Sequence, residues 1–159
     1  DFSYGLNIYL EYKNFDLTMF WQGVQGVDVI SDLKKETDLW SGLNIGFLNK
    51  GKRVLDAWSP TNPNSTIPAL SRSDTNNEKR VSTYFVENGS FLKLRNIQLG
   101  YNVPKNFAQK MKMERLRFYL SAQNVFTIKS KEFTGVDPEN ANYGYPIPMN
   151  ITFGINVGF

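Results

Sequence analysis

The chain begins with a strict alternation of apolar and polar side chains. In residues 2–12 every even position is apolar or aromatic, and in residues 15–21 the same phase resumes on odd positions. A period of two is that of a β-strand with one apolar face. Because only Lys13 and Asn14 separate the two runs, the pattern predicts a β-hairpin.

Three later stretches repeat this period. Odd positions carry the apolar phase in residues 97–103 and 151–159, and even positions carry it in residues 116–122. Each stretch predicts a strand with one apolar face. The five predicted strands cover residues 1–12, 15–23, 91–103, 115–127 and 150–159.

The connections between these strands alternate in length. Residues 13–14 and the basic connector 105–114, which has the spacing of a helical turn, are short. Residues 24–90 and 128–149 form long connections rich in Gly, Pro, Asn and Ser. Outer-membrane barrels have short periplasmic turns and long external loops. The order therefore favours an antiparallel transmembrane β-barrel segment in which 24–90 and 128–149 are external and the chain ends on the periplasmic side.

The positions of aromatic and charged residues fit this interpretation. No acidic or basic residue occupies the apolar phase in the centre of a predicted strand, where it would meet lipid. Aromatic residues occur at both strand ends, as in the two aromatic girdles of barrels: Tyr12, Phe15, Tyr101 and Phe159 at one end, and Phe2, Tyr4 and Trp21 at the other. A soluble β-sandwich shows the same segregation and remains the alternative.

Five strands do not close a membrane barrel, and single-chain bacterial barrels have an even strand number. If the short connections are periplasmic, the first strand runs from the outside of the membrane to the periplasm. We therefore expect an odd number of strands before Asp1. The residues after Asp1 show no signal peptide, which agrees with this expectation.

Composition narrows the function classes further. The 159 residues include 41% hydrophobic side chains, 18 Lys and Arg, 15 Asp and Glu, and neither Cys nor His. The absence of Cys and His excludes disulfides, thiol catalysis, Cys/His zinc sites and His-dependent catalysis within this chain. A net charge of +3 is too small for a nucleic-acid footprint. The longest uncharged stretch, 140–159, contains too many Asn, Gly and Pro residues for a membrane helix.

The loops contain only weak chemical motifs. They are a calcium-loop-like spacing at 74–78, a Ser-x-x-Lys pattern at 31–34, and the carboxylate pairs Glu36/Asp38 and Asp28/Asp32. The spacing at 74–78 lacks the Gly and the Glu of a calcium loop. The Ser-x-x-Lys pattern lacks the partner motifs of acyl-transfer serine enzymes. Nothing places either carboxylate pair across a cleft, as glycoside hydrolysis requires. We therefore predict no catalytic residue, no metal and no cofactor, although a loop-borne hydrolase stays an open third hypothesis.

Aromatic residues in the long loops are the candidates for contact with a ligand or a partner: Trp40, Trp58, Tyr84, Tyr143 and Tyr145. They would stack on sugar rings or pack against another protein. The alternative is that they fold a long loop on itself. The basic residues Lys105, Lys110, Lys112 and Arg115 predict a solvated turn near phosphates or lipid headgroups.

Five sequence motifs occur in an order that resembles a known family. They are SFLKLRNIQLGYNVP at 90–104, LRFYLSAQNVFT at 116–127, FTGVDPEN at 133–140, YPIP at 145–148 and ITFGINVGF at 151–159. This part of the chain resembles the C-terminal end of SusC/RagA-type TonB-dependent outer-membrane transporters of Bacteroidetes. The first hairpin resembles them loosely, and residues 25–83 match only as a long variable loop.

The resemblance implies a role and a set of partners. It implies the last five strands of a 22-stranded barrel in the cell outer membrane, plugged by an N-terminal domain that lies before Asp1 and is energised by TonB. Oligosaccharides or peptides would be imported with a SusD-like surface lipoprotein, without enzyme activity. The outer-membrane assembly machinery would recognise the terminal strand through Ile151, Phe153, Ile155, Val157 and Phe159. A soluble β-sandwich glycan-binding module is the alternative.

Overall fold

The computed structural model describes residues 1–39, 49–71, 77, 80–142 and 144–159. These residues form two compact units. The first, here called the sheet unit, comprises Asp1–Val27, Ser90–Lys129 and Ile147–Phe159. The second, called the loop unit, comprises Asp28–Gly89 and Ser130–Pro146.

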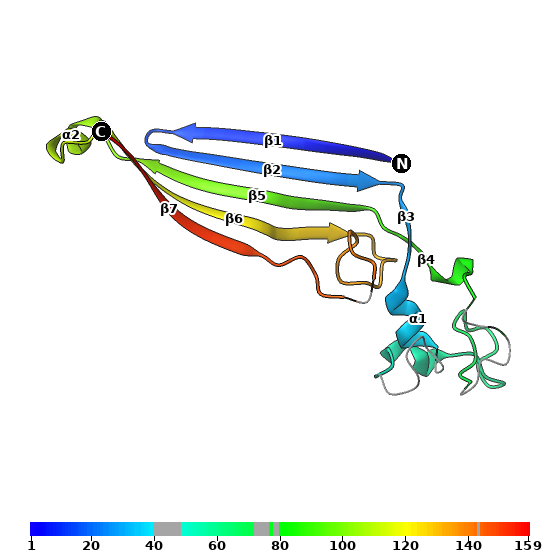
Figure 1. Ribbon diagram of the computed structural model, residues 1–159. Coiled ribbons are helices and arrows are strands. Elements are labelled where there is room, and N and C mark those ends of the chain that lie inside the picture. The colour runs from blue at the N-terminus through cyan, green and yellow to red at the C-terminus, as the bar shows by residue number, and fades with distance from the viewer. Residues whose placement is uncertain (40–48, 72–76, 78–79, 143) are drawn as a thin grey trace. The chain divides into compact units, whose positions relative to one another are not determined.

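The sheet unit is a single antiparallel sheet with the strand order β1-β2-β5-β6-β7 (Figure 1). Its strands are β1 (Phe2–Tyr12), β2 (Phe15–Gln25), β5 (Phe91–Asn102), β6 (Arg115–Lys129) and β7 (Asn150–Gly158). The prediction of five antiparallel strands is confirmed. Strands β1 and β7 lie at the two edges, and within the described residues each pairs with one neighbour.

Two short connections join strands at the same end of this sheet. The β1–β2 turn places Lys13 in the left-handed region, with a φ of 55°. The backbone N–H of Asn102 in β5 donates to the carbonyl of Asn14 at 2.8 Å, which ties the turn to the next strand. The connector between β5 and β6 contains helix α2 (Lys105–Lys110), where the sequence predicts a turn of helix.

The strand register collects the apolar residues of all five strands on one face. Paired residues in adjacent antiparallel strands project to the same side of the sheet. One row across the sheet consists of Leu10, Leu17, Leu99, Leu120 and Phe153. The neighbouring rows repeat the pattern, so this side is here called the apolar face and the opposite side the polar face.

A β-bulge interrupts the register of β5. Phe20 and Trp21 are consecutive in β2, but their partners Asn96 and Leu94 are separated by Arg95. The inserted residue moves the apolar phase of β5 from even positions before the bulge to odd positions after it. This shift explains why clear alternation in the sequence starts only beyond Arg95.

The loop unit falls in segments that the sequence predicts only as loops. It contains a two-stranded ladder, a short α-helix and two 3₁₀ turns: β3 (Asp28–Ile30), β4 (Val86–Asn88), α1 (Asp32–Asp38), η1 (Lys52–Asp56) and η2 (Thr83–Phe85). These elements were not predicted because each is shorter than the run over which a hydrophobic period is recognised, about 4 to 8 residues for a strand and about 11 to 18 for a helix. The buried apolar side chains of the loop unit include Leu39, Val54, Phe85 and Phe133. Among the described residues, no helix is both long and apolar enough to span a membrane.

Candidate functional site

The apolar face of the sheet unit is exposed in the part of the chain that the structure describes. Leu120 in the centre of β6 is 49% exposed, and its neighbour Phe153 in β7 is 66% exposed. A soluble protein seldom leaves a continuous apolar surface of this kind facing water, so such a surface marks contact with an apolar partner. All five strands contribute to it, and the charges of the strands lie outside its central rows.

The polar face carries a charge pair that joins three strands. Arg117 in β6 donates through Nη2 to Oδ1 of Asp16 in β2 at 2.5 Å, and through Nε to Oδ2 at 3.1 Å. Asn102 in β5 donates to the same carboxylate at 3.0 Å. Asp16 is buried, so its charge is compensated by a two-pronged guanidinium and an amide rather than by water.

Gly100 in β5 leaves room for this pair. Its register partner in β2 is Asp16, and a Cβ atom at Gly100 would collide with the Arg117 guanidinium and with both Asp16 carboxylate oxygens. A side chain at this position would therefore force the Asp16–Arg117 pair to shift. Sequence reasoning missed this site, although both charged residues lie in the polar phase, because pairing across three strands depends on the register.

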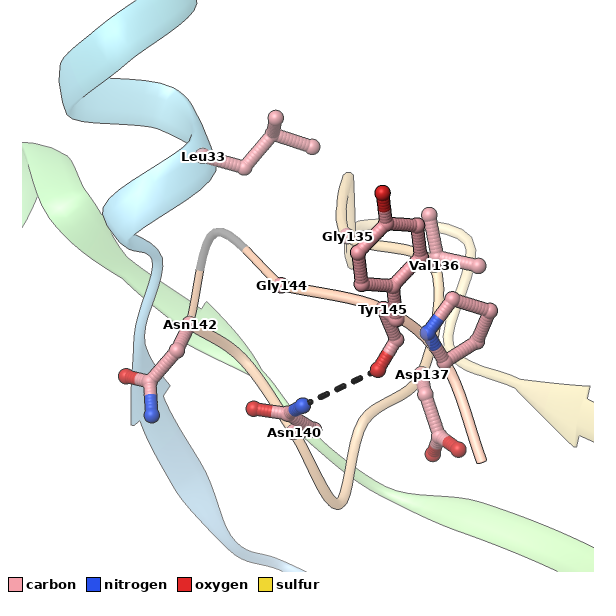
Figure 2. A pocket seen from close by; sticks show the side chains of 9 residues that line it. Leu33, Gly135, Val136, Asp137, Asn140, Asn142, Gly144 and Tyr145 are labelled. Atoms are coloured by element: carbon pink, nitrogen blue, oxygen red, sulfur yellow. Dashed lines mark hydrogen bonds between the residues drawn. The ribbon is translucent and has the colours of Figure 1, made fainter. Parts of the chain in front are cut away.

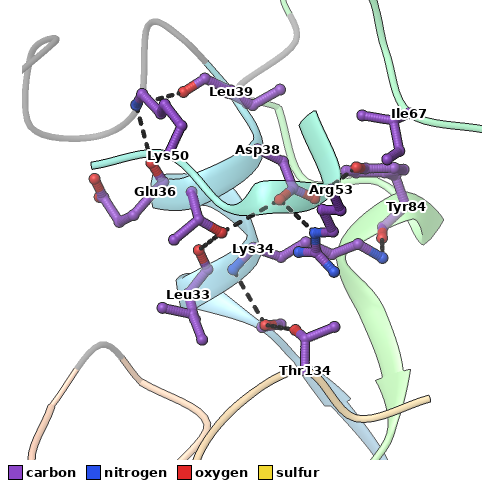
Figure 3. A network of polar contacts seen from close by, with 12 residues as sticks. Leu33, Lys34, Glu36, Asp38, Leu39, Lys50, Arg53, Ile67, Tyr84 and Thr134 are labelled. Carbon is purple, nitrogen blue, oxygen red and sulfur yellow. Dashed lines mark hydrogen bonds and ion pairs between the residues drawn. The ribbon is translucent and has the colours of Figure 1, made fainter. Parts of the chain in front are cut away.

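In the loop unit, a buried carboxylate organises the segment after α1 (Figure 3). Asp38 accepts hydrogen bonds from Arg53 Nε at 2.6 Å and from the hydroxyl of Tyr84 at 2.7 Å. The Thr37 hydroxyl lies 3.2 Å from the same carboxylate. Burial, followed by the hydrogen bond to the Asp38 carboxylate, raises the pKa of the Tyr84 phenol above its usual value.

A second buried carboxylate connects the two segments of the loop unit. Glu87 in β4 accepts the backbone N–H of Thr134 at 2.9 Å and the Thr134 hydroxyl at 2.8 Å. Lys34 Nζ lies 3.8 Å from Glu87 and donates to the Tyr84 carbonyl at 2.6 Å. Thr134 belongs to the FTGVDPEN motif, so this motif is held against β4 by a side chain that sequence reasoning did not single out.

The weak motifs of the loops have structural roles. Ser31 is the N-cap of α1 and accepts the backbone N–H of Lys34 at 3.2 Å, whereas the Lys34 ammonium group points to the Tyr84 carbonyl. Asp32 forms an ion pair with Lys35. The calcium-like spacing at 74–78 lies outside the described residues except Asn77. Within the described part of the chain, no group of three or more acidic side chains is arranged to hold a metal.

The five aromatic residues predicted as loop contacts lie in different environments, and two of them fall outside the described residues. Trp40 and Tyr143 lie outside the described residues. Tyr84 packs edge-on against Phe85, and its hydroxyl is bound by Asp38, as expected for an aromatic that folds the loop on itself. Trp58 is exposed, and its backbone N–H donates to Ile67. The structure thus brings Tyr84 into a packed network and leaves Trp58 on the surface.

Tyr145 is more exposed than Trp58 and lines a pocket of about 400 Å³ in the loop unit (Figure 2). Its side chain is 95% exposed, and its carbonyl accepts the side-chain amide of Asn140 at 3.3 Å. The pocket wall combines an aromatic ring, amides, a carboxylate and backbone: Leu33, Gly135, Val136, Asp137, Asn140, Asn142, Gly144, Tyr145 and Pro146. Such a lining can stack on and hydrogen-bond a polar ligand.

The residues named as an assembly signal lie together on the apolar face. Ile151, Phe153, Ile155 and Val157 follow one another at intervals of two along the edge strand β7, and all are exposed. Phe159 follows the strand and is also exposed. Within the described residues β7 pairs only with β6, so its outer edge is open.

Comparisons with known proteins agree on one family. No family model matches the chain. A TonB-dependent receptor of Formosa agariphila is 33% identical over 175 aligned residues, which cover 100% of this chain and 16% of that protein. The TonB-dependent receptor SusC of Bacteroides thetaiotaomicron is 31% identical, covering 100% of this chain and 15% of that receptor.

Solved structures show the same relationship. A structure of the RagAB peptide transporter matches 99% of this chain with a TM-score of 0.75 and 31% sequence identity. The RagAB peptide importer in its "open-open" state matches the same share with a TM-score of 0.79 and 27% identity. The chain belongs to the SusC/RagA family of TonB-dependent receptors.

The SusC/RagA family assignment agrees with the motif-based resemblance. The relatives are named as receptors and transporters rather than as enzymes, which agrees with the prediction of no catalytic role. The chain spans about one sixth of the length of the SusC/RagA relatives that it matches.

Proposed function

We propose that this chain is the C-terminal barrel portion of an outer-membrane, TonB-dependent importer of oligosaccharides or peptides. The exposed apolar face that runs across all five strands is the observation that carries this proposal, because lipid is the partner that a continuous lateral apolar surface fits. The two RagAB structures, named as a peptide transporter and a peptide importer, support the import function.

The two faces of the sheet have different tasks in this proposal. The apolar face meets the bilayer, and the polar face with the Asp16–Arg117 pair meets the lumen and the plug domain that TonB acts on. The outer-membrane assembly machinery recognises β7 and Phe159. A soluble sandwich would bury the apolar face under a second sheet, whereas Leu120 and Phe153 on this face are exposed.

The loop unit forms the external part of the chain in this proposal. Its buried Asp38 and Glu87 networks keep the long loop folded, and Trp58 and Tyr145 are left exposed for contact with substrate or with a SusD-like lipoprotein. Trp40 and Tyr143, which lie outside the described residues, are candidates from the sequence alone. The Tyr145 pocket is the best-defined candidate for ligand contact, because its ring and amides suit sugar hydroxyls and peptide groups alike.

Cysteine labelling of the full-length receptor on intact cells tests the topology. The chain contains no Cys, so an introduced thiol is unique within this segment. Leu55→Cys, in the exposed η1 turn, should react with a membrane-impermeant maleimide on intact cells. Asn106→Cys, on exposed α2, should react only after the outer membrane is permeabilised. Labelling of Asn106→Cys on intact cells would contradict the proposed orientation.

Uptake measurements test the transport function itself. Cells lacking the receptor gene should lose uptake of one class in a panel of labelled oligosaccharides and peptides, and a protonophore should abolish the same uptake in wild-type cells. Normal uptake of every panel member in the deletion strain would refute the importer proposal.

A further inference from the structure

The connector between β5 and β6 presents two apolar side chains to its surroundings. Phe107 in α2 is 60% exposed, and Met111, which caps the helix, is 48% exposed. Residues four apart lie on the same side of a helix, so the two side chains form one apolar ridge. Ala108 is buried and marks the side on which α2 packs against the rest of the sheet unit.

The connector with α2 lies at one end of the sheet (Figure 1). Leu116 belongs to the apolar phase of β6 and pairs with Val157, yet Leu116 is buried, whereas Leu120 on the same face is half-exposed. The helix α2 packs against β6 at this end. The connector therefore covers Leu116 at the end of the apolar face, and its own apolar ridge lies at that end of the sheet.

Positive charge surrounds this ridge. Lys105, Lys110 and Lys112 are exposed, and within residues 105–115 Glu114 is the single acidic residue. The Lys110 ammonium group lies 5.6 Å from the centre of the Phe107 ring. Lysine stems lie along apolar surface while their ammonium groups reach for water or phosphate, so this arrangement suits a boundary between hydrocarbon and anionic headgroups.

We propose that this connector is an interfacial anchor that inserts Phe107 and Met111 among the lipids of the adjacent leaflet. The lysines at 105, 110 and 112 bind the phosphates of anionic phospholipids there. Two observations select lipid as the occupant: α2 packs at the end of the lipid-facing apolar face, where Leu116 is buried, and the charge of the connector is complementary to phosphate headgroups. This inference rests on the proposed membrane topology.

Spin-label accessibility in the reconstituted full-length receptor tests the anchor. Phe107→Cys is labelled with a nitroxide in vesicles of phosphatidylethanolamine and phosphatidylglycerol, after replacement of any cysteine outside this segment. Collisions with oxygen should exceed collisions with a water-soluble nickel complex, as for a label within lipid. Gln109→Cys is the matched control, because its side of α2 is opposite to Phe107 and should give the reverse ratio.

A label at Leu120→Cys separates failure of the anchor from failure of the membrane topology. This position, in the middle of the apolar face, should show deeper lipid exposure than Phe107→Cys. If Leu120→Cys reports lipid while Phe107→Cys reports water, the anchor is wrong and the barrel proposal stands. If both report water, the membrane topology fails. A Phe107 label that is shielded from both reagents would identify a protein neighbour and would also overturn the anchor.

The charge requirement is tested by lipid composition. Removing phosphatidylglycerol from the vesicles should shift the Phe107→Cys label toward water. The triple variant Lys105→Gln, Lys110→Gln and Lys112→Gln should show the shifted position already in phosphatidylglycerol and should no longer respond to its removal. A label depth independent of both lysines and lipid charge would overturn the phosphate-binding part of the proposal.

Discussion

Asp16 and Arg117 are 101 positions apart in the sequence, yet the Arg117 guanidinium holds the Asp16 carboxylate at 2.5 Å on the polar face of the sheet. The residue between them in space is Gly100, whose strand β5 separates β2 from β6. The pair thus fixes the mutual register of three strands, because a slip of either neighbour by one residue would move one charge to the apolar face.

Gly100→Ala should destabilise the receptor by about 1 to 3 kcal/mol, because the added methyl group overpacks the Asp16–Arg117 pair. Samples are heated to a series of temperatures before SDS electrophoresis, and the temperature at which the band of folded receptor disappears measures the effect. Gly158→Ala is the control, since a Cβ there would meet its nearest neighbour, Arg115 Cβ, at an ordinary 3.4 Å. Equal melting temperatures for the two variants would show that Gly100 is not sterically required.

Leu120→Arg should reduce membrane insertion by about 2 to 4 kcal/mol, because Leu120 is in the middle of the lipid-facing surface. Ser121→Arg, one position along the same strand, should be much milder, because Ser121 lies on the polar face and its hydroxyl binds Asn96. The amount of folded receptor in outer-membrane fractions compares the two. Equal losses would contradict the assignment of the apolar face to lipid, and the same comparison applies to Leu99→Arg and Gln98→Arg.

The Tyr84 phenol should titrate above its ordinary pKa of about 10, because burial and the Asp38 carboxylate oppose its ionisation. The folded state then keeps a proton that the unfolded state loses. The stability contributed by this group is therefore complete below about pH 10 and falls as the pH rises further. The difference in tyrosinate absorbance between wild type and Tyr84→Phe measures this titration, and a midpoint at or below 10 would contradict the buried contact.

Phe159→Ala separates two roles of the exposed residue after β7. If Phe159 is read by the assembly machinery, as proposed, unassembled receptor should accumulate in the periplasm. If Phe159 only packs against lipid, the loss of its side chain should cost roughly 1.5 to 3 kcal/mol while surface levels stay normal. Quantifying the receptor at the cell surface and in the periplasm distinguishes the two outcomes, and Val157→Ala serves as the control for lost apolar area.

Much of the sheet could be predicted from the sequence because strand formation here is a local property. The alternation in residues 2–12 or 151–159 depends on neighbouring positions alone, and it specifies both a strand and its apolar side. The same reasoning failed for β3, β4 and α1, whose three to seven residues are too few for the hydrophobic pattern to repeat recognisably. For the loop aromatics, the sequence could name Tyr84 and Tyr145 but could not tell that one is hydrogen-bonded and the other exposed.

Side-chain alternation is enough to identify the residues of the sheet and the apolar phase of each strand. It does not specify which residues meet across strands and loops. The Asp16–Arg117 pair depends on the hydrogen-bonded register of β2, β5 and β6, and that register includes a bulge at Arg95. Glu87 and Thr134 meet because two distant loop segments pack into one unit. Such contacts are set by the relative placement of whole elements, a property that no local pattern encodes.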